Sequence, residues 1–383
     1  MISLLPALRD LWRALVIGAL IAAVVGGGSL ALSAAKKRAP DPDYLFNDSH
    51  FHLTNYVQKG TDIRRYLEIM GDKVGRSTLF GIPLQQQWSY ANSGDFAPTY
   101  YLQSDAPLYY YSFTDAYIAR VYQALPKEQQ ARLDPMITGF NPTDMYAVDH
   151  IRRVLELFPG VFSGIGEFSI HKEFVSSKVA GETASLTNPA LDRILDFAAE
   201  VGLAVILHND IDMPFAKEGS EPIYLKQMKD LLRRHRSTTI IWAHIGLGRV
   251  VHPVQGQATE EAAERSPAYR EIVEQLVADP TLGHVYYDIS WDEVAKYAIA
   301  NPEVEKRVAD MLNSHPDRFL FGTDNVAPQD QAAQLRVYHL WDPVWAQLTP
   351  EASLKIRKGN YQRIFDAARA RVRAWEKANV KPL

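Results

Sequence analysis

Short apolar runs recur along the chain at intervals of about 40 residues, and each is followed by a polar or glycine-rich stretch. Segments with helical spacing separate these runs. In Leu191–Val201, for example, the apolar residues fall on one face, while Asn188-Pro189 precedes the segment and Gly202 follows it, as is usual at helix ends. The pattern therefore predicts strands that alternate with helices. The eight predicted strands are Tyr44–Phe46, Thr78–Pro83, Met136–Phe140, Val161–Ile165, Leu203–Leu207, Thr238–Ala243, Val285–Ile289 and Phe319–Phe321.

Strands that alternate with helices pair in parallel through right-handed crossovers. Eight such units within residues 44–383, with all-apolar strands, predict an α/β protein with a closed (β/α)8 TIM-barrel fold. A doubly wound open sheet is the main alternative, but no G-x-G-x-x-G motif follows the first strand. An extra C-terminal helix is expected over Tyr361–Lys377, where apolar residues again have helical spacing. We expect it to cap the barrel exterior, the alternative being a basic amphipathic helix at a membrane surface.

The first 43 residues differ from the rest of the chain. Residues 14–35 carry no charge, and Lys36–Arg38 follow them directly. About 20 helical residues cross a bilayer, so this run is long enough to be a transmembrane helix. It also fits a long signal peptide, because Ser33-Ala34-Ala35 places small residues where signal peptidase cuts. We therefore predict that residues 1–43 are a signal peptide or an N-terminal membrane anchor plus linker. The protein is then exported and periplasmic or extracytoplasmic, either released or held at the inner membrane.

The composition narrows the functional classes. With 47% hydrophobic and 22% charged residues, the chain of 383 residues is globular. It contains no cysteine, which excludes disulfides, zinc–thiolate sites, iron–sulfur clusters and a thiol nucleophile. The formal net charge of −4 argues against a nucleic-acid partner. A small-molecule substrate is expected instead, and a homo-oligomer stays open.

Aromatic residues crowd the long connection after the second predicted strand, between Gln85 and Tyr111. Structureless connections of this length are commonly functional or disordered, and the aromatic content argues against disorder. We expect a flap that encloses the substrate; packing on the surface or on a partner subunit is the alternative. The candidate substrate contacts in this connection are Trp88, Tyr90, Tyr100 and Tyr101. Asn209 and Trp291, which follow later strands, are further candidates, with a turn or cap role as the alternative for each.

Histidines and carboxylates stand directly after five of the apolar runs. In a barrel the carboxyl ends of all strands face one mouth, so these residues are expected to converge there. Any one of them alone would suit a structural hydrogen bond or a turn, but their register with the repeat favours a shared site. Imidazole and carboxylate ligands without thiolates suit a borderline divalent ion, most plausibly Zn²⁺, with Mn²⁺, Fe²⁺, Co²⁺ or Ni²⁺ as alternatives. The candidate ligands are His50, His52, Glu167, His208, His244 and Asp324.

This ordered set resembles the amidohydrolase superfamily of metal-dependent hydrolases, and within it the amidohydrolase-related branch that includes lactonases and metal-dependent decarboxylases. The tail Ile356-Arg357-Lys358-Gly359-Asn360, followed by Ile364-Phe365, resembles the closing helix signature of that branch. The resemblance covers Tyr44 to Phe365 and also implies a TIM barrel.

The resemblance implies roles for the matching positions. His50 and His52 bind the first ion, and His208 is a further ligand. Glu167 stands where relatives have a bridging carboxylate or a carboxylated lysine, so either one or two ions are bound; with one ion, His244 polarises the substrate. Lys172 lies beyond the strand end, which makes a carboxylated lysine a poor expectation. Asp324 contacts the ion or its water.

These residues predict hydrolysis. A divalent ion lowers the pKa of bound water from 15.7 toward about 7, Asp324 moves a proton, and the ion with His244 stabilises a developing oxyanion. The predicted catalytic residues are Asp324, His244 and Glu167. We expect a carboxylic ester, lactone or amide as substrate. The alternatives are a metal-dependent nonoxidative decarboxylase, a phosphoester hydrolase and a tethered non-catalytic binding barrel.

Overall fold

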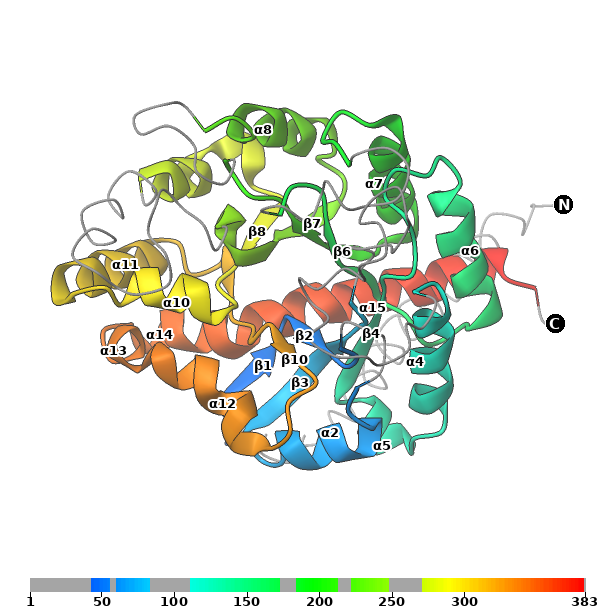
Figure 1. Ribbon diagram of the computed structural model, residues 1–383, viewed down its shortest axis with the longest axis horizontal. Helices are drawn as coiled ribbons and strands as arrows, with labels where there is room; N and C mark the ends of the chain where they lie inside the picture. Colours follow the sequence, from blue (N-terminus) through cyan, green and yellow to red (C-terminus); the bar gives the residue numbers. More distant parts are fainter. Residues whose placement is uncertain are drawn as a thin grey trace, which may run out of the picture. The chain divides into compact units, whose positions relative to one another are not determined.

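Eight parallel strands form the central sheet of the computed structural model, which describes residues 43–55, 60–82, 111–172, 184–212, 222–247 and 271–381. Each strand pairs with the next one along the chain, in the order β1-β3-β4-β5-β6-β7-β8-β9, and helices surround the sheet (Figure 1). The strands are β1 Phe46–Asp48, β3 Val74–Leu79, β4 Leu133–Ile137, β5 Gly164–Ser169, β6 Ala204–His208, β7 Thr239–Trp242, β8 Val285–Asp288 and β9 Phe319–Leu320.

The first and last strands are joined at their carboxyl ends. Two short strands, β2 (Phe51–His52) and β10 (Asn325–Val326), follow β1 and β9 and pair in parallel. Ser49 N donates to Phe321 O at 3.1 Å, and Asp324 N donates to His50 O at 2.8 Å. The predicted (β/α)8 TIM-barrel fold is therefore confirmed.

Helices connect the strands and cover the outside of the sheet. The predicted helix at Leu191–Val201 is α7, which begins after Asn188, whose side chain accepts from Ala190 N, and ends at Gly202 with φ 88°. The helices are α2 Ile63–Met70, α4 Phe113–Gln123, α5 Lys127–Gln130, α6 Ala147–Leu157, α7 Pro189–Val201, α8 Leu225–Arg234, η3 Pro280–Leu282, α10 Asp292–Ala298, α11 Pro302–Ser314, α12 Gln331–Leu340, α13 Asp342–Trp345, α14 Pro350–Leu354, the π-helical turn η4 Lys355–Gly359, and α15 Asn360–Asn379.

The extra C-terminal helix is present as α15, but it does more than cover the exterior. It runs across the strands in Figure 1 and contacts β1, β6 and β9. Asn360 Nδ2 donates to Phe319 O, and Arg369 donates to Leu133 O, so α15 lies at the amino ends of the strands. Its apolar side chains join the interior cluster of the barrel, which contains Phe80, Met136, Ala204, Ile206, Ile241, Ala243, Leu320, Tyr361, Ile364, Phe365 and Ala368. The helix thus seals the barrel at the end away from the predicted site.

Four predicted strands, β1, β3, β4 and β5, have boundaries that are wrong by two residues or more. Strands β3 and β4 begin earlier than predicted because they contain Arg76 and Asp134, which interrupt the apolar runs. Asp134 is fully buried and accepts hydrogen bonds from Arg76, Tyr361 and Arg369. This compensation comes from Arg76 in the neighbouring strand β3 and from α15, which is far away in the sequence.

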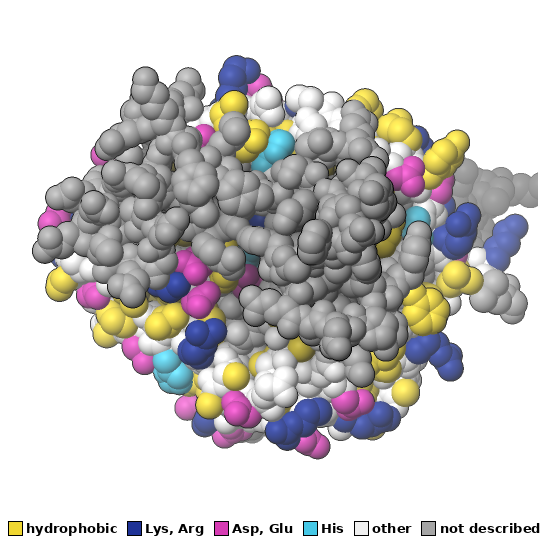
Figure 2. Space-filling model, in the orientation of Figure 1, with side chains coloured by type: hydrophobic (Ala, Val, Ile, Leu, Met, Phe, Trp, Pro, Cys, Tyr) yellow, Lys and Arg dark blue, Asp and Glu magenta, His cyan; other side chains and the backbone are white. Residues whose placement is uncertain are grey.

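The predicted leader at residues 14–35 lies outside the described residues. Within the part of the chain that is described, no helix has the length and apolar character needed to cross a membrane. On the face shown in Figure 2, basic and acidic side chains are interspersed along the lower edge.

Candidate metal centre

All six candidate ligands lie at the carboxyl end of the barrel. His50 lies in the turn between β1 and β2, and His52 ends β2. The other four lie in or directly after their strands: Glu167 in β5, His208 at the end of β6, His244 after β7 and Asp324 between β9 and β10. The Asp324 side chain is 11% exposed, and the other five residues are at most 2% exposed.

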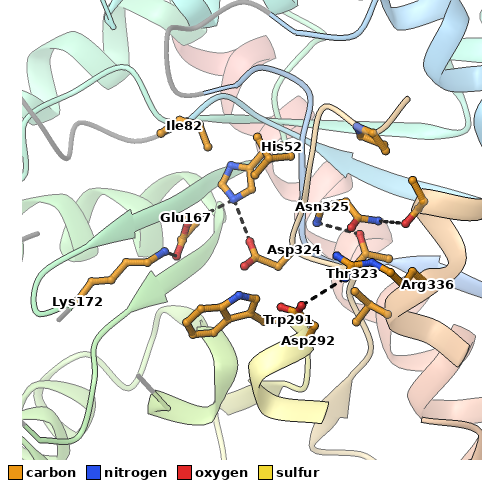
Figure 3. Close-up of a pocket in the computed structure, with 14 residues that line it drawn as sticks. His52, Ile82, Glu167, Lys172, Trp291, Asp292, Thr323, Asp324, Asn325 and Arg336 are labelled. Atoms are coloured by element: carbon orange, nitrogen blue, oxygen red, sulfur yellow. Dashed lines mark hydrogen bonds and ion pairs between the residues drawn. The ribbon is translucent and has the colours of Figure 1, made fainter. Parts of the chain in front are cut away.

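The two histidines of the first strand face two carboxylates. His50 Nε2 lies 3.3 Å and His52 Nε2 lies 3.2 Å from Asp324 Oδ1. His52 Nε2 is also 3.4 Å from Glu167 Oε2. Figure 3 shows His52, Glu167 and Asp324 pointing toward one another. As expected from the H-x-H spacing, both imidazoles therefore reach the same space.

The other oxygen of Glu167 faces a second group of nitrogen atoms. His208 Nδ1 lies 2.6 Å, Lys172 Nζ 3.3 Å and His244 Nε2 3.6 Å from Glu167 Oε1. Glu167 thus lies between two groups of side chains, one on each of its carboxylate oxygens.

The chemistry of these groups fits a divalent ion. Nε2 of His50 and Nε2 of His244 are buried, and neither has a hydrogen-bond partner in the described part of the chain. A buried polar atom without a partner is costly, and a bound cation would remove that cost. Three groups have ligand atoms within 4.8 Å of one another: His50, His52, Glu167 and Asp324; Glu167, His208 and His244; and His50, His244 and Asp288.

Asp288 and Ser290 link the outer edges of two of these histidines. His50 Nδ1 lies 2.6 Å from Asp288 Oδ2, and Ser290 Oγ donates to the same oxygen at 2.7 Å. His244 Nδ1 lies 2.9 Å from Ser290 Oγ. Because an ionised carboxylate only accepts and Ser290 gives its single hydrogen to Asp288, both Nδ1 atoms carry hydrogen. Each Nε2 then points to the centre and would offer its lone pair to an ion once it carries no proton.

The remaining two histidines are oriented in the same manner. His52 Nδ1 donates to Gly81 O at 2.9 Å, and His208 Nε2 lies 2.9 Å from Asp210 Oδ1. A ring held through its outer nitrogen keeps a fixed orientation toward the centre.

The electrostatics favour charged carboxylates beside a neutral His244. Burial by itself raises the pKa of Glu167, but Lys172 and the surrounding histidines hold that pKa well below its ordinary value. Burial likewise opposes ionisation of Asp324, yet His244 and His50 lower its pKa. Burial lowers the pKa of His244. Burial opposes charge on His50, His52 and His208 as well, but the neighbouring carboxylates raise the pKa of each of these three above its ordinary value, so His244 is the exception among the four imidazoles.

A cavity of about 260 Å³ opens beside these residues. Trp291 lines it, and the Trp291 ring lies 5.0 Å from the ring of His244. Lys172 and Arg336 also line the cavity and are shown in Figure 3. Asn209, a candidate substrate contact, is fully buried instead, and its amide donates to the carbonyl of Asp210. The candidate contacts Trp88, Tyr90, Tyr100 and Tyr101 lie outside the described residues.

A sequence profile of the amidohydrolase family matches residues 48–367. The chain belongs to the amidohydrolase family. It is accordingly a metal-dependent hydrolase, as the resemblance implied. No curated protein sequence matches the chain significantly.

Similar solved structures include two enzymes. Dihydroorotase from Campylobacter jejuni is 14% identical, with a TM-score of 0.47, and the match covers 84% of each chain. The 4-oxalomesaconate hydratase from Rhodopseudomonas palustris is 15% identical, with a TM-score of 0.46, and the match covers 87% of this chain and 99% of the hydratase. Likeness at this level does not determine a substrate or a reaction.

The backbone of this amidohydrolase is strained around the centre. Among the described residues, the non-glycine residues with positive φ all follow β7, β8 or β9: His244, Ile245, Trp291, Asp324 and Ala327. Such conformations cost about 1–3 kcal/mol each and are concentrated at functional sites. Gly322 permits the close approach of β9 to His50, because a Cβ there would lie 2.7 Å from His50 Cβ.

Several residues that contact the ligands were not predicted to do so. Asp288, in the predicted strand Val285–Ile289, is expected at the same mouth, but there it would suit a substrate contact or a turn as well. Ser290 and Asp210 follow strands in positions that are also usual for turn residues. Sequence spacing did not indicate that Lys172 belongs to the site, because Lys172 lies beyond the end of β5 and only its long side chain reaches back to Glu167.

Proposed function

We propose that this amidohydrolase cleaves a carboxylic ester, a lactone or an amide with a divalent ion, Zn²⁺ being the first choice. One observation supports this most directly. Among the described residues, two buried imidazole nitrogens without partners, on His50 and His244, face the ionised carboxylates of Glu167 and Asp324 at the mouth of the barrel.

His50, His52, Glu167 and Asp324 are the residues that would hold the ion. When bound, a divalent ion lowers the pKa of water toward about 7 and polarises a carbonyl oxygen. The imidazoles are already oriented by Asp288 and by Gly81 O, so little rearrangement is needed on binding.

Asp324 is the proposed general base and acid. Its Oδ1 faces His50 and His52, whereas its Oδ2 lies 3.8 Å from His244 Nε2. Oδ2 would therefore take the proton of the attacking water and return it to the leaving group. General acid–base catalysis of this kind contributes about 10²- to 10⁴-fold.

His244 is proposed to position that water by accepting a hydrogen bond at Nε2. Its Nδ1 hydrogen is directed to Ser290, so the neutral ring has no second hydrogen to donate. This hydrogen-bond pattern favours an acceptor role for His244 over the expected donor role toward an oxyanion.

The test is a metal-reconstituted enzyme assayed on a panel of chromogenic esters, lactones and amides. Asp324→Asn, assayed at an ion concentration that keeps the site loaded, should lower kcat at least about 100-fold. His50→Ala should lower both kcat and the metal content. Ser163→Ala is a matched control, because Ser163 is buried and its Oγ has no partner among the described residues. A fully metal-loaded enzyme that cleaves none of these substrates, or an unchanged kcat in Asp324→Asn, would overturn the proposal.

We further propose that residues 1–43 export the protein, on the strength of the uncharged run at residues 14–35. A fusion of the full chain to a phosphatase that is active only outside the cytoplasm tests this. Phosphatase activity is the expected result, and an inactive fusion recovered from the cytoplasm would exclude export.

A further inference from the structure

Lys172 places a positive charge against the carboxylate at the middle of the centre. Its Nζ lies 3.3 Å from Glu167 Oε1, and its side chain is only 13% exposed. Figure 3 shows the side chain extending toward Glu167, with the Trp291 ring nearby; Nζ lies 5.9 Å from the centre of that ring. The ammonium is thus part of the site, although its residue lies beyond the strand.

The two oxygens of Glu167 have different surroundings. Oε2 faces His50 and His52, which form the first group of candidate ligands together with Asp324. Oε1 belongs to the second group, with His208 and His244. Lys172 contacts this second oxygen, which is the one that an ion in the second group would need.

His208 is also engaged in the second group. Its Nδ1 lies 2.6 Å from Glu167 Oε1 and its Nε2 lies 2.9 Å from Asp210 Oδ1. Both ring nitrogens therefore face carboxylate oxygens. The corresponding Nε2 atom of His50, in the first group, has no hydrogen-bond partner among the described residues. His244 Nε2 in the second group likewise has no partner among the described residues, so the two groups differ in what lies on the oxygen of Glu167 that each uses: only Oε1, in the second group, is in contact with Lys172 and His208.

The charge on Lys172 opposes a second cation. At an effective dielectric constant of about 20, repulsion between two unit charges about 4 Å apart lowers the affinity for the incoming ion by a factor on the order of 10³. A divalent ion is repelled more strongly. An ion in the first group is on the far oxygen of Glu167 and experiences less of this repulsion.

We propose that the ammonium of Lys172 takes the place of a second divalent ion, so that this amidohydrolase holds one ion, in the group formed by His50, His52, Glu167 and Asp324. This inference rests on the proposed metal-loaded centre and specifies its stoichiometry. Lys172 then acts through Glu167 as a positioning residue.

The experiment counts ions rather than turnover. Metal-free full-length protein is titrated with Mn²⁺ or Zn²⁺, and bound ions are counted by native mass spectrometry and elemental analysis. We expect one ion per chain in the wild type and two in Lys172→Met, which removes the charge but keeps an unbranched side chain only one atom shorter. The gain in affinity at the second group should be on the order of 10³-fold. Lys172→Arg, which keeps the charge, is the matched control and should bind one ion.

Two ions in the wild type, or one ion in a folded Lys172→Met variant, would overturn the inference. If Lys172→Met does not fold, electron paramagnetic resonance of Mn²⁺ in the wild type still decides. An isolated ion gives an uncoupled spectrum, and a spectrum of two coupled ions contradicts the inference. If one ion binds but no ester, lactone or amide is cleaved, the proposed function fails while the inference stands.

Discussion

Asp288→Asn is the substitution that tests most sharply whether residues behind the ligands prepare the centre. The Asp288 carboxylate is fully buried and accepts from His50 Nδ1 at 2.6 Å, from Ser290 Oγ at 2.7 Å and from Ser290 N at 3.0 Å. Asparagine keeps the shape but loses the charge and one of the two acceptor oxygens. His50 or Ser290 then loses a hydrogen bond to a charged group, which is worth about 1.5–3 kcal/mol.

The loss should appear in the affinity for the ion, because a correctly protonated and oriented His50 is what binds it. A cost of 1.5–3 kcal/mol corresponds to about 10- to 100-fold, which matches the usual effect of changing such outer partners. Ser290→Ala removes the hydrogen bonds of Ser290 Oγ to Asp288 and His244 but leaves the contact between Asp288 and His50 in place, so it should cost less in ion affinity, up to about tenfold. The assay is competition for Zn²⁺ against a chromophoric chelator.

Ser163→Ala is the control for the loss of a buried hydroxyl and should leave Zn²⁺ affinity unchanged. Circular dichroism and urea unfolding show whether each variant is folded. If folded Asp288→Asn binds Zn²⁺ within twofold of the wild type, then the contact between Asp288 and His50 does not prepare the ligand, and the reasoning is refuted.

Three further predictions concern stability. Removing the ion with a chelator should lower the midpoint of thermal unfolding, because an ion at 100 times its Kd stabilises the fold by about 2.7 kcal/mol. In the same calorimetric scan, the chelator should lower the midpoint of His50→Ala by less. Asp134→Asn should destabilise the fold by about 3 kcal/mol in urea unfolding, because it weakens buried contacts to Arg369 and Tyr361, and a loss under 1 kcal/mol contradicts this. Burial lowers the pKa of His171 to about 4, so the unfolded chain binds a proton between pH 6.5 and 4 that the folded chain does not. Stability should fall as pH falls through that window, and His171→Phe should remove part of the fall; equal losses in both proteins would argue against the buried histidine as the cause.

The barrel could be predicted because its local signals agree with one another. Apolar runs alternate with helical segments, and α7 has its Asn188 and Gly202 ends where the sequence indicated them. The position of the centre also followed from topology, because residues after parallel strands meet at one end of a barrel.

The parts that could not be predicted depend on contacts between distant residues. Arg76 and Asp134 break the apolar pattern of two strands. They pair with each other, and Tyr361 and Arg369 of α15, more than 200 positions after Asp134, complete the hydrogen bonds of its carboxylate. The short strands β2 and β10 have two residues each, too few for any periodicity. Lys172 joins the site through the length of its side chain, which sequence spacing does not encode.

The position of α15 has a consequence for the order of folding. Tyr361, Ile364, Phe365 and Ala368 complete the interior of the barrel, yet they lie in α15, which is synthesised after all eight strands. Until these residues emerge, Met136, Ile206 and Leu320 have no cover at the amino end of the strands. Before α15 has been synthesised, the strands can therefore form, at most, a collapsed sheet whose amino end is open to water, and the cooperative native state forms only once α15 is available.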